Sequence, residues 1–138
     1  MLTAWTTRLL LVALIGGAVA GCDDETPTSP NPTPIIVTET FTGSIGQNDA
    51  QTHQFSAGSS GAVVATLRSL VPDNALVVGF SLGNWNGNAC QIVLANDEAT
   101  AGAILNGTVS AAGNLCLRVH DVGNITNRAA YTVEVVHP

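Results

Sequence analysis

The sequence contains no lysine, and its only basic residues besides histidine are Arg8, Arg68, Arg118 and Arg128. Ten acidic residues oppose them, which gives a formal net charge of -6 at pH 7. Affinity for nucleic acid comes mostly from Lys and Arg that neutralise phosphates, and attraction to anionic lipid surfaces requires basic clusters. Because the arginines are few and scattered, we predict no nucleic-acid partner and no polybasic membrane contact.

The sequence also lacks an apolar run long enough to span a bilayer comfortably. The hydrophobic stretch over residues 9–20 is about a dozen residues long, whereas a membrane core needs roughly 20. The stretch follows a short segment that carries the single positive charge of Arg8, and it ends in small residues. This arrangement is typical of a signal peptide, which we place at residues 1–21.

The residues at the end of this stretch, Val19-Ala20-Gly21-Cys22, resemble the lipobox of bacterial lipoproteins. The resemblance implies that the Cys22 thiol receives a diacylglycerol, and that cleavage leaves Cys22 as the acylated N-terminus. Acyl chains such as palmitate would then hold the protein on a membrane of the bacterial cell envelope. The outer membrane, the periplasmic face of the inner membrane and the cell surface all stay open. The alternatives are an ordinary signal peptide with a chance cysteine, or an uncleaved anchor.

A polar stretch follows the lipobox and separates it from the rest of the chain. Residues 23–34 contain four prolines and no large apolar side chain, so they cannot offset the entropy cost of folding. We therefore predict an acylated cysteine and a disordered Pro/Thr-rich linker over residues 22–34. Its prolines favour extended geometry, which would hold a domain off the lipid surface.

The amino-acid composition changes at residue 35, where β-branched residues dominate and Gly and Asn recur at short intervals. Short strands separated by regular turn signals predict a sandwich or barrel. We expect about eight strands within a single domain over residues 35–138. They are Ile35–Phe41, Thr52–Ser56, Ala62–Leu70, Leu76–Leu82, Ala89–Ala95, Ile104–Ser110, Leu115–His120 and Tyr131–Val136.

Period-two alternation assigns the faces of these strands. We expect the first strand to turn Ile35, Val37 and Phe41 to one face and to end before a loop over residues 43–49. Asn86-Gly87 is predicted to supply both positive-φ residues of a tight hairpin. The inward residues of two later strands are Leu76, Val78, Phe80 and Leu82, and Leu115, Leu117 and Val119.

Residues 40–136 are similar to the bacterial pre-peptidase C-terminal (PPC-like) domains. The similarity rests on four segments, Phe41–Ile45, Thr52–Phe55, Ala111–Val119 and Tyr131–Val135. It implies an all-β fold, a single jelly-roll-like antiparallel β-sandwich. It also implies an accessory or substrate-binding role, often on polymers, and in some members a structural calcium. The chain departs from the family where Thr52 and His53 replace the usual acidic residue and tyrosine, and where Cys116-Leu117 replaces the usual aromatic.

Cys22 aside, two cysteines remain, Cys90 and Cys116. A pair of cysteines in an exported domain favours a disulfide, which we expect between neighbouring strands. Closing a loop of this length stabilises a fold by about 3 kcal/mol in the chain-entropy model. The alternatives are two buried free thiols or a metal pair, although the sequence has no CxxC or HxxxH spacing.

Signals for catalysis are few. The sequence has no Gly-x-Ser-x-Gly and no His-Glu-x-x-His motif. His120 and Asp121 are neighbours in a strand and so point to opposite faces, and we expect His53 and His120 on solvent faces. We predict no catalytic residue, no metal site and no cofactor. A structural calcium stays open because residues 96–98 and 121–124 offer oxygens, although Asn and Asp are also ordinary turn residues.

The residues that most strongly suggest a ligand-binding site lie in a predicted hairpin connection. They are Asn84, Trp85, Asn86 and Asn88. An exposed aromatic ring among amides suits sugar recognition, so we predict these four as candidate ligand-binding residues. The alternative is that Trp85 folds back to cap the sandwich. The sequence thus favours a membrane-tethered, non-catalytic binding or accessory module for a polysaccharide or peptide polymer. The alternatives are a structural, self-assembling or partner-binding envelope protein, and a small hydrolase.

Overall fold

The computed structural model describes Pro30 and residues 32–138, and Pro32–Pro138 form one compact unit. The predicted signal peptide, Cys22 and the linker up to Ser29 lie outside the described residues. No helix of the length and hydrophobicity needed to cross a bilayer occurs among the residues that are described.

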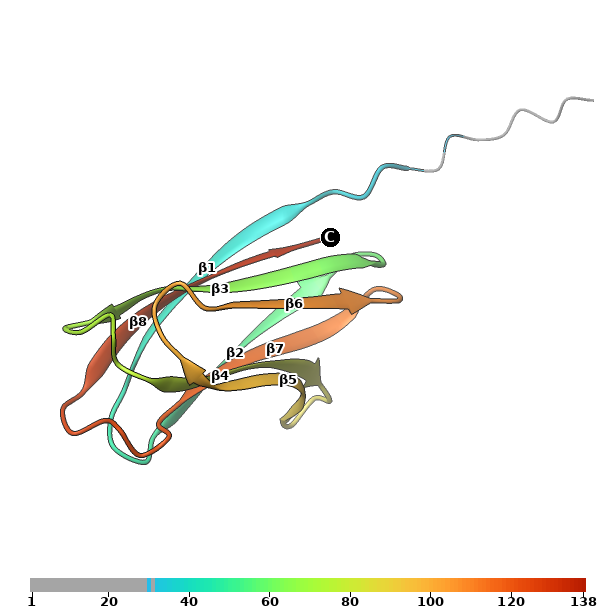
Figure 1. Ribbon diagram of the computed structural model, residues 1–138. Helices are drawn as coiled ribbons and strands as arrows, with labels where there is room; N and C mark the ends of the chain where they lie inside the picture. Colours follow the sequence, from blue (N-terminus) through green and yellow to red (C-terminus); the bar gives the residue numbers. More distant parts are fainter. Residues whose placement is uncertain (1–29, 31) are drawn as a thin grey trace, which may run out of the picture. The chain divides into compact units, whose positions relative to one another are not determined.

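The compact unit is built from eight β-strands (Figure 1), and the described residues contain no helix. Their number and order agree with the prediction, although most strands are longer than expected. The strands are β1 (Val37–Ile45), β2 (Ala50–Ala57), β3 (Gly61–Val71), β4 (Val78–Trp85), β5 (Cys90–Ala99), β6 (Ile104–Val109), β7 (Gly113–His120) and β8 (Ala129–His137).

The strands form two four-stranded sheets in which every neighbouring pair is antiparallel. Sheet A has the order β1-β8-β3-β6, and sheet B has the order β2-β7-β4-β5. Successive strands along the chain mostly alternate between the sheets. Together with the two strand orders, this is the double Greek key topology of a jelly roll. The predicted jelly-roll-like β-sandwich is therefore confirmed. β1 and β2 form the outer strands on one side of the sandwich, and β6 and β5 on the other.

The core lies between the two sheets and follows the alternation of the strands. In β4 the side chains of Val78, Phe80 and Leu82 are buried, as predicted. In β7 the predicted inward residues, Leu115, Leu117 and Val119, are buried too. Leu76 lies before β4 and is only partly buried against the core. Burying such side chains contributes about 1.5–3 kcal/mol each.

The prediction for the first strand is partly wrong. Ile35 lies outside β1 and is 81% exposed, because the chain overhangs the core before the strand begins. β1 instead runs to the fully buried Ile45, so the first part of the predicted loop over residues 43–49 is strand. The glycine that suggested a turn, Gly43, has a packing role. A Cβ there would lie 2.4 Å from the hydroxyl of Tyr131, its partner on β8.

Candidate functional site

A groove opens between the two sheets on the side formed by β5 and β6. Its volume is about 300 Å³, at the lower end for small-molecule sites. β5 and β6 belong to different sheets and are joined by residues 100–103, which cross from sheet B to sheet A (Figure 1). The lining residues are Val63, Leu82, Gly83, Asn84, Val93, Leu94, Asn106, Gly107, Thr108, Val109 and Leu115.

The groove combines an apolar interior with a polar rim. Val63, Leu82 and Leu115 are buried core residues that reach the groove from β3, β4 and β7. Asn106 and Thr108 are exposed on β6 and border the groove at its outer edge. None of the lining residues is charged. An apolar cavity with a few polar groups at its mouth can bind an uncharged group and orient it by hydrogen bonds.

Two irregularities of β5 and β6 shape this groove. The β4–β5 register shifts between Leu82, which pairs with Leu94, and Gly83, which pairs with Ile92. Val93 is therefore the extra residue of a bulge, and its side chain lines the groove while 67% exposed. On β6, a Cβ at Gly107 would meet side-chain carbons of Leu82 and Leu94 at 3.3 Å. A larger residue would crowd the floor of the groove.

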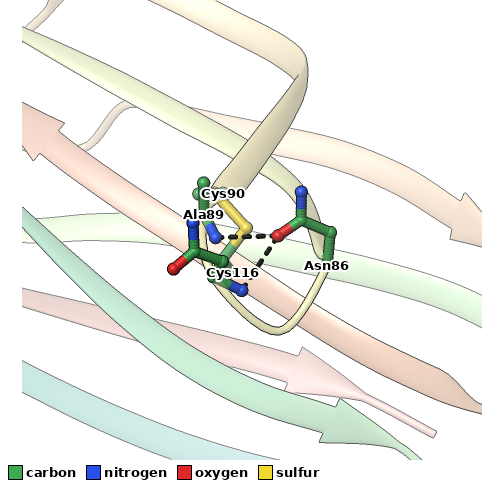
Figure 2. Close-up of a disulfide and its surroundings, with 5 residues drawn as sticks. Asn86, Ala89, Cys90 and Cys116 are labelled. Carbon is green, nitrogen blue, oxygen red and sulfur yellow. Dashed lines mark hydrogen bonds between the residues drawn. A yellow bond between two sulfur atoms is a disulfide. The ribbon is translucent and has the colours of Figure 1, made fainter.

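A disulfide between Cys90 and Cys116 holds the adjacent end of β5 (Figure 2). The sulfur atoms are 2.07 Å apart and the Cα atoms 5.7 Å apart. The pairing follows the prediction, but the strands are not neighbours, because β4 lies between β5 and β7. The span is short because β5 passes closely over Gly83, where a Cβ would lie 2.1 Å from the Gln91 carbonyl oxygen. Cys116 is completely buried beneath this crossing.

The predicted hairpin connects β4 to β5, and Asn86 organises its turn. The Asn86 side-chain oxygen accepts hydrogen bonds from the backbone N–H groups of Asn88 at 2.9 Å and Ala89 at 2.8 Å (Figure 2). Gly87 has a φ of +95°, whereas Asn86 does not adopt positive φ, so that part of the prediction is wrong. The amide oxygen of Asn86 is therefore occupied by hydrogen bonds within the turn.

The structure separates the four predicted ligand-binding residues. Asn84 lines the groove. Trp85 is the last residue of β4, pairs with Cys90 and is half-buried, and by alternation from Leu82 it lies on the outer face of sheet B. Asn88 is exposed in the turn. Sequence reasoning missed Val93, Asn106 and Thr108. The last two lie in a stretch without charge between Glu98 and Arg118, whereas no sequence signal marked Val93.

The opposite side of the sandwich, between β1 and β2, is filled by rings. The Phe41 ring centroid lies 5.1 Å from that of His53 and 6.2 Å from that of Phe55, and Phe55 lies 5.1 Å from His137. His53 therefore lies on the core face of β2, which corrects the predicted solvent face. Its Nε2 and the Tyr131 hydroxyl share a hydrogen bond of 2.8 Å. This partner reduces the cost of placing the imidazole among apolar groups.

Burial shifts the titration of both members of this hydrogen-bonded pair. Loss of solvent lowers the pKa of His53 below 6.5 because the charged imidazolium is disfavoured. Desolvation, with a smaller contribution from the negative charge of Asp49, raises the pKa of Tyr131 to about 12. Both groups are therefore held neutral near pH 7, which suits a packing role.

His120 lies on the outer face of sheet B, as predicted, but it is largely covered. Its Nε2 is 3.5 Å from Asp97 Oδ1, and only 23% of the side chain is exposed. Its Nδ1 is buried without a hydrogen-bond partner among the described residues. The ring lies against Gly79, where a Cβ would be 2.0 Å from the imidazole. His120 packs over β4.

In the two segments that offered calcium ligands, the side-chain oxygens of Asn96 and Asp121 accept hydrogen bonds from the backbone of their own segments. Asp121 Oδ1 accepts backbone hydrogen bonds from Gly123, Asn124 and Ile125, and Oδ2 accepts one from Asn48. These bonds, with that from Asn48 the largest, lower the pKa of Asp121. Residues 96–98, which were predicted as a loop, belong to β5, where the Asn96 side-chain oxygen accepts a hydrogen bond from the Glu98 N–H. Within residues 32–138, no three His, Cys, Asp or Glu side chains come together as a metal site.

No family model matches this chain, and no curated protein matches it either.

Proposed function

We propose that this chain is a membrane-tethered, non-catalytic lipoprotein of the bacterial cell envelope whose β-sandwich is a binding module. The anchor in this proposal is Cys22, acylated after removal of residues 1–21. It is supported by the short apolar run, by the four-residue match that ends at Cys22 and by the proline-rich stretch that follows. The resemblance to the PPC-like domains supports an accessory role.

The observation that carries the binding role is the groove between β5 and β6. Its lining is uncharged, with aliphatic side chains inside and the polar residues Asn84, Asn106 and Thr108 at its borders. Such a lining suits a segment of a neutral polymer, a peptide or a polysaccharide, rather than a polyanion. No aromatic side chain lines it, which favours a peptide over the flat faces of sugar rings.

A non-catalytic role is supported by the surroundings of the histidines. His53 is bonded to the Tyr131 hydroxyl, and His120 lies over Gly79. His137 is buried with its Nε2 2.9 Å from Glu39 Oε1. None of the three lines the groove.

The anchor and the binding module are tested separately. Metabolic labelling of the full chain with radioactive palmitate should label the wild type and leave Cys22→Ser unlabelled; equal labelling of both would refute the anchor. For binding, the chain from residue 22 with Cys22→Ser is incubated with insoluble envelope polysaccharides and with immobilised peptides. Saturable retention that Asn106→Lys weakens is expected, and no retention on any material would overturn the binding role.

A second candidate function, self-assembly as a structural protein of the envelope, is favoured by exposed apolar residues on the outer strands. Ile92 and Val93 on β5 and Ile104 on β6 are 42%, 67% and 53% exposed. Such residues on sheet edges promote edge-to-edge association. Sedimentation velocity over a range of concentrations distinguishes the two, since a module that recognises a separate polymer should remain monomeric.

A further inference from the structure

The two sides of the sandwich are closed in different ways. Between β1 and β2, the rings of Phe41, His53 and Phe55 fill the space between the sheets. Between β5 and β6 the corresponding position is held by aliphatic side chains such as Leu82 and Leu94, and the groove remains open. The fold is thus complete on one side and has room for additional chain on the other.

The free edge of β6 borders this open side. β6 is the outermost strand of sheet A and pairs only with β3, so the backbone groups on its other edge have no strand partner. Strand edges are usually protected by charges, prolines or bulges. β6 contains none of these, and its register with β3 is unbroken. β5 differs, because its register with β4 shifts at two places.

The composition of the groove constrains what can add to this edge. Side chains of an added strand point alternately inward and outward. Those that point inward would meet the uncharged lining that includes Leu82, Leu94 and Val109. Gly107 in the middle of β6 leaves the groove open for these side chains, because a Cβ there would crowd Leu82 and Leu94. The inward residues of the occupant should therefore be apolar.

Charge indicates the direction of the occupant. Asp97 and Glu98 are exposed near the end of β5, which is joined to the start of β6 through residues 100–103. Glu98 forms no ion pair among the described residues. All strand pairs in sheet A are antiparallel, and an antiparallel addition would place its C-terminal end at the start of β6. A basic residue there would lie near Glu98, whereas Asp97 already approaches His120 across β4.

We propose that this groove binds an extended peptide of a partner protein, added antiparallel to β6, with apolar residues at alternate positions and Lys or Arg at its C-terminal end. The backbone hydrogen bonds of β6 supply affinity, and the groove selects the alternate side chains. The inference rests on the proposed binding role and names the class of its ligand.

The test uses the chain from residue 22 with Cys22→Ser and a labelled peptide of six residues, one for each residue of β6. The peptide alternates Val and Thr and ends in a C-terminal Arg. Fluorescence anisotropy should show saturable binding, weakened about tenfold or more when Arg is moved to the N-terminus or replaced by Glu. The variant Val93→Asp should lose binding, because Val93 lines the groove and is 67% exposed. Ile36→Asp is the matched control, since Ile36 is 62% exposed and does not line the groove.

Backbone methylation tests strand addition without changing the protein. N-methyl groups on one set of alternate peptide residues remove the N–H groups that face β6, whereas those on the other set face away. One methylated peptide should lose binding and the other should keep it. Equal binding of both would overturn strand addition. This comparison keeps its meaning even if Val93→Asp disturbs folding, which circular dichroism would reveal.

The remaining outcomes separate this inference from the proposed function. Retention on a polysaccharide that Val93→Asp abolishes, with no peptide bound, would keep the binding module and overturn the peptide. A dimer that Val93→Asp dissociates would make a second copy of the chain the occupant and also overturn it. Absence of every ligand and of self-association would remove both the inference and the binding role.

Discussion

Asp97 on β5 and His120 on β7 approach to 3.5 Å across the intervening strand β4, above Gly79. Four residues along β4, the Cys90–Cys116 disulfide makes the same crossing above Gly83. One polar contact and one covalent bond therefore span the outer face of β4. Residues 78–83 of β4 are buried on both faces of the sheet as a result.

Gly79, which lies beneath the contact between Asp97 and His120, should be intolerant of a side chain. In Gly79→Ala the new Cβ would lie 2.0 Å from the His120 ring, which must move away together with its contact to Asp97. We expect a loss of about 1–3 kcal/mol in the free energy of unfolding, the range for overpacked sites, measured by urea denaturation. Gly113→Ala is the control, because a Cβ there meets nothing within 4 Å and should change stability little. Equal stability of Gly79→Ala and wild type would contradict the packing described.

The disulfide should stabilise the domain and affect the signal of Trp85. Replacing both cysteines by Ala removes a link across a separation of 26 residues and should cost about 3 kcal/mol. Trp85 is the only tryptophan downstream of the predicted signal peptide, and it pairs directly with Cys90. A disulfide quenches a nearby indole, so reduction should raise the emission of the folded protein. An unchanged emission spectrum after complete reduction would argue against this proximity.

The chain contains a single tyrosine, Tyr131, so its ionisation can be followed directly by ultraviolet absorbance. Desolvation raises its pKa to about 12 from 10.0. The unfolded chain releases this proton near pH 10 and the folded chain does not, so stability should fall as pH rises through this interval. Absorbance at the phenolate band should show a midpoint near 12 in the folded protein and near 10 in denaturant. A folded midpoint near 10 would refute the buried position.

His53 should make the fold sensitive to mild acid. Its folded pKa lies below 6.5 because burial disfavours the imidazolium. Between that folded pKa and 6.5 the unfolded state binds more protons, so the free energy of unfolding falls as pH is lowered below 6.5. His53→Gln removes this titration and should flatten that part of the profile in urea titrations. An identical slope in variant and wild type would assign the pH dependence to other groups.

Part of this architecture could be predicted from local sequence pattern. Alternation identified Val78, Phe80 and Leu82 as core residues, and the Asn86-Gly87 pair located the hairpin. Both are short-range properties, since the side-chain period of a strand and the conformation of a turn depend on adjacent residues.

Other features were misread because neighbours in space gave a residue a different use. Gly43 suggested a loop, whereas it lies in β1 where the Tyr131 ring leaves no room for a Cβ. His53 suggested a solvent face, whereas the Tyr131 hydroxyl allows it to face the core. In both cases the residue that decides the outcome is Tyr131, which lies about eighty residues or more away in the sequence.

The sequence by itself determined that residues 35–138 are rich in β-strands, in which order the strands follow one another, and which face of most strands is buried. These properties depend on local alternation and turn chemistry. It also supplied the pair of cysteines. Only the tertiary structure decided that β4 lies between the strands that carry the two cysteines. It also decided that Asn84 and Trp85 lie on opposite faces of sheet B, and that β5 and β6 border a groove. Strand partners are selected by contacts distant in sequence, and no local pattern encodes which edges come together.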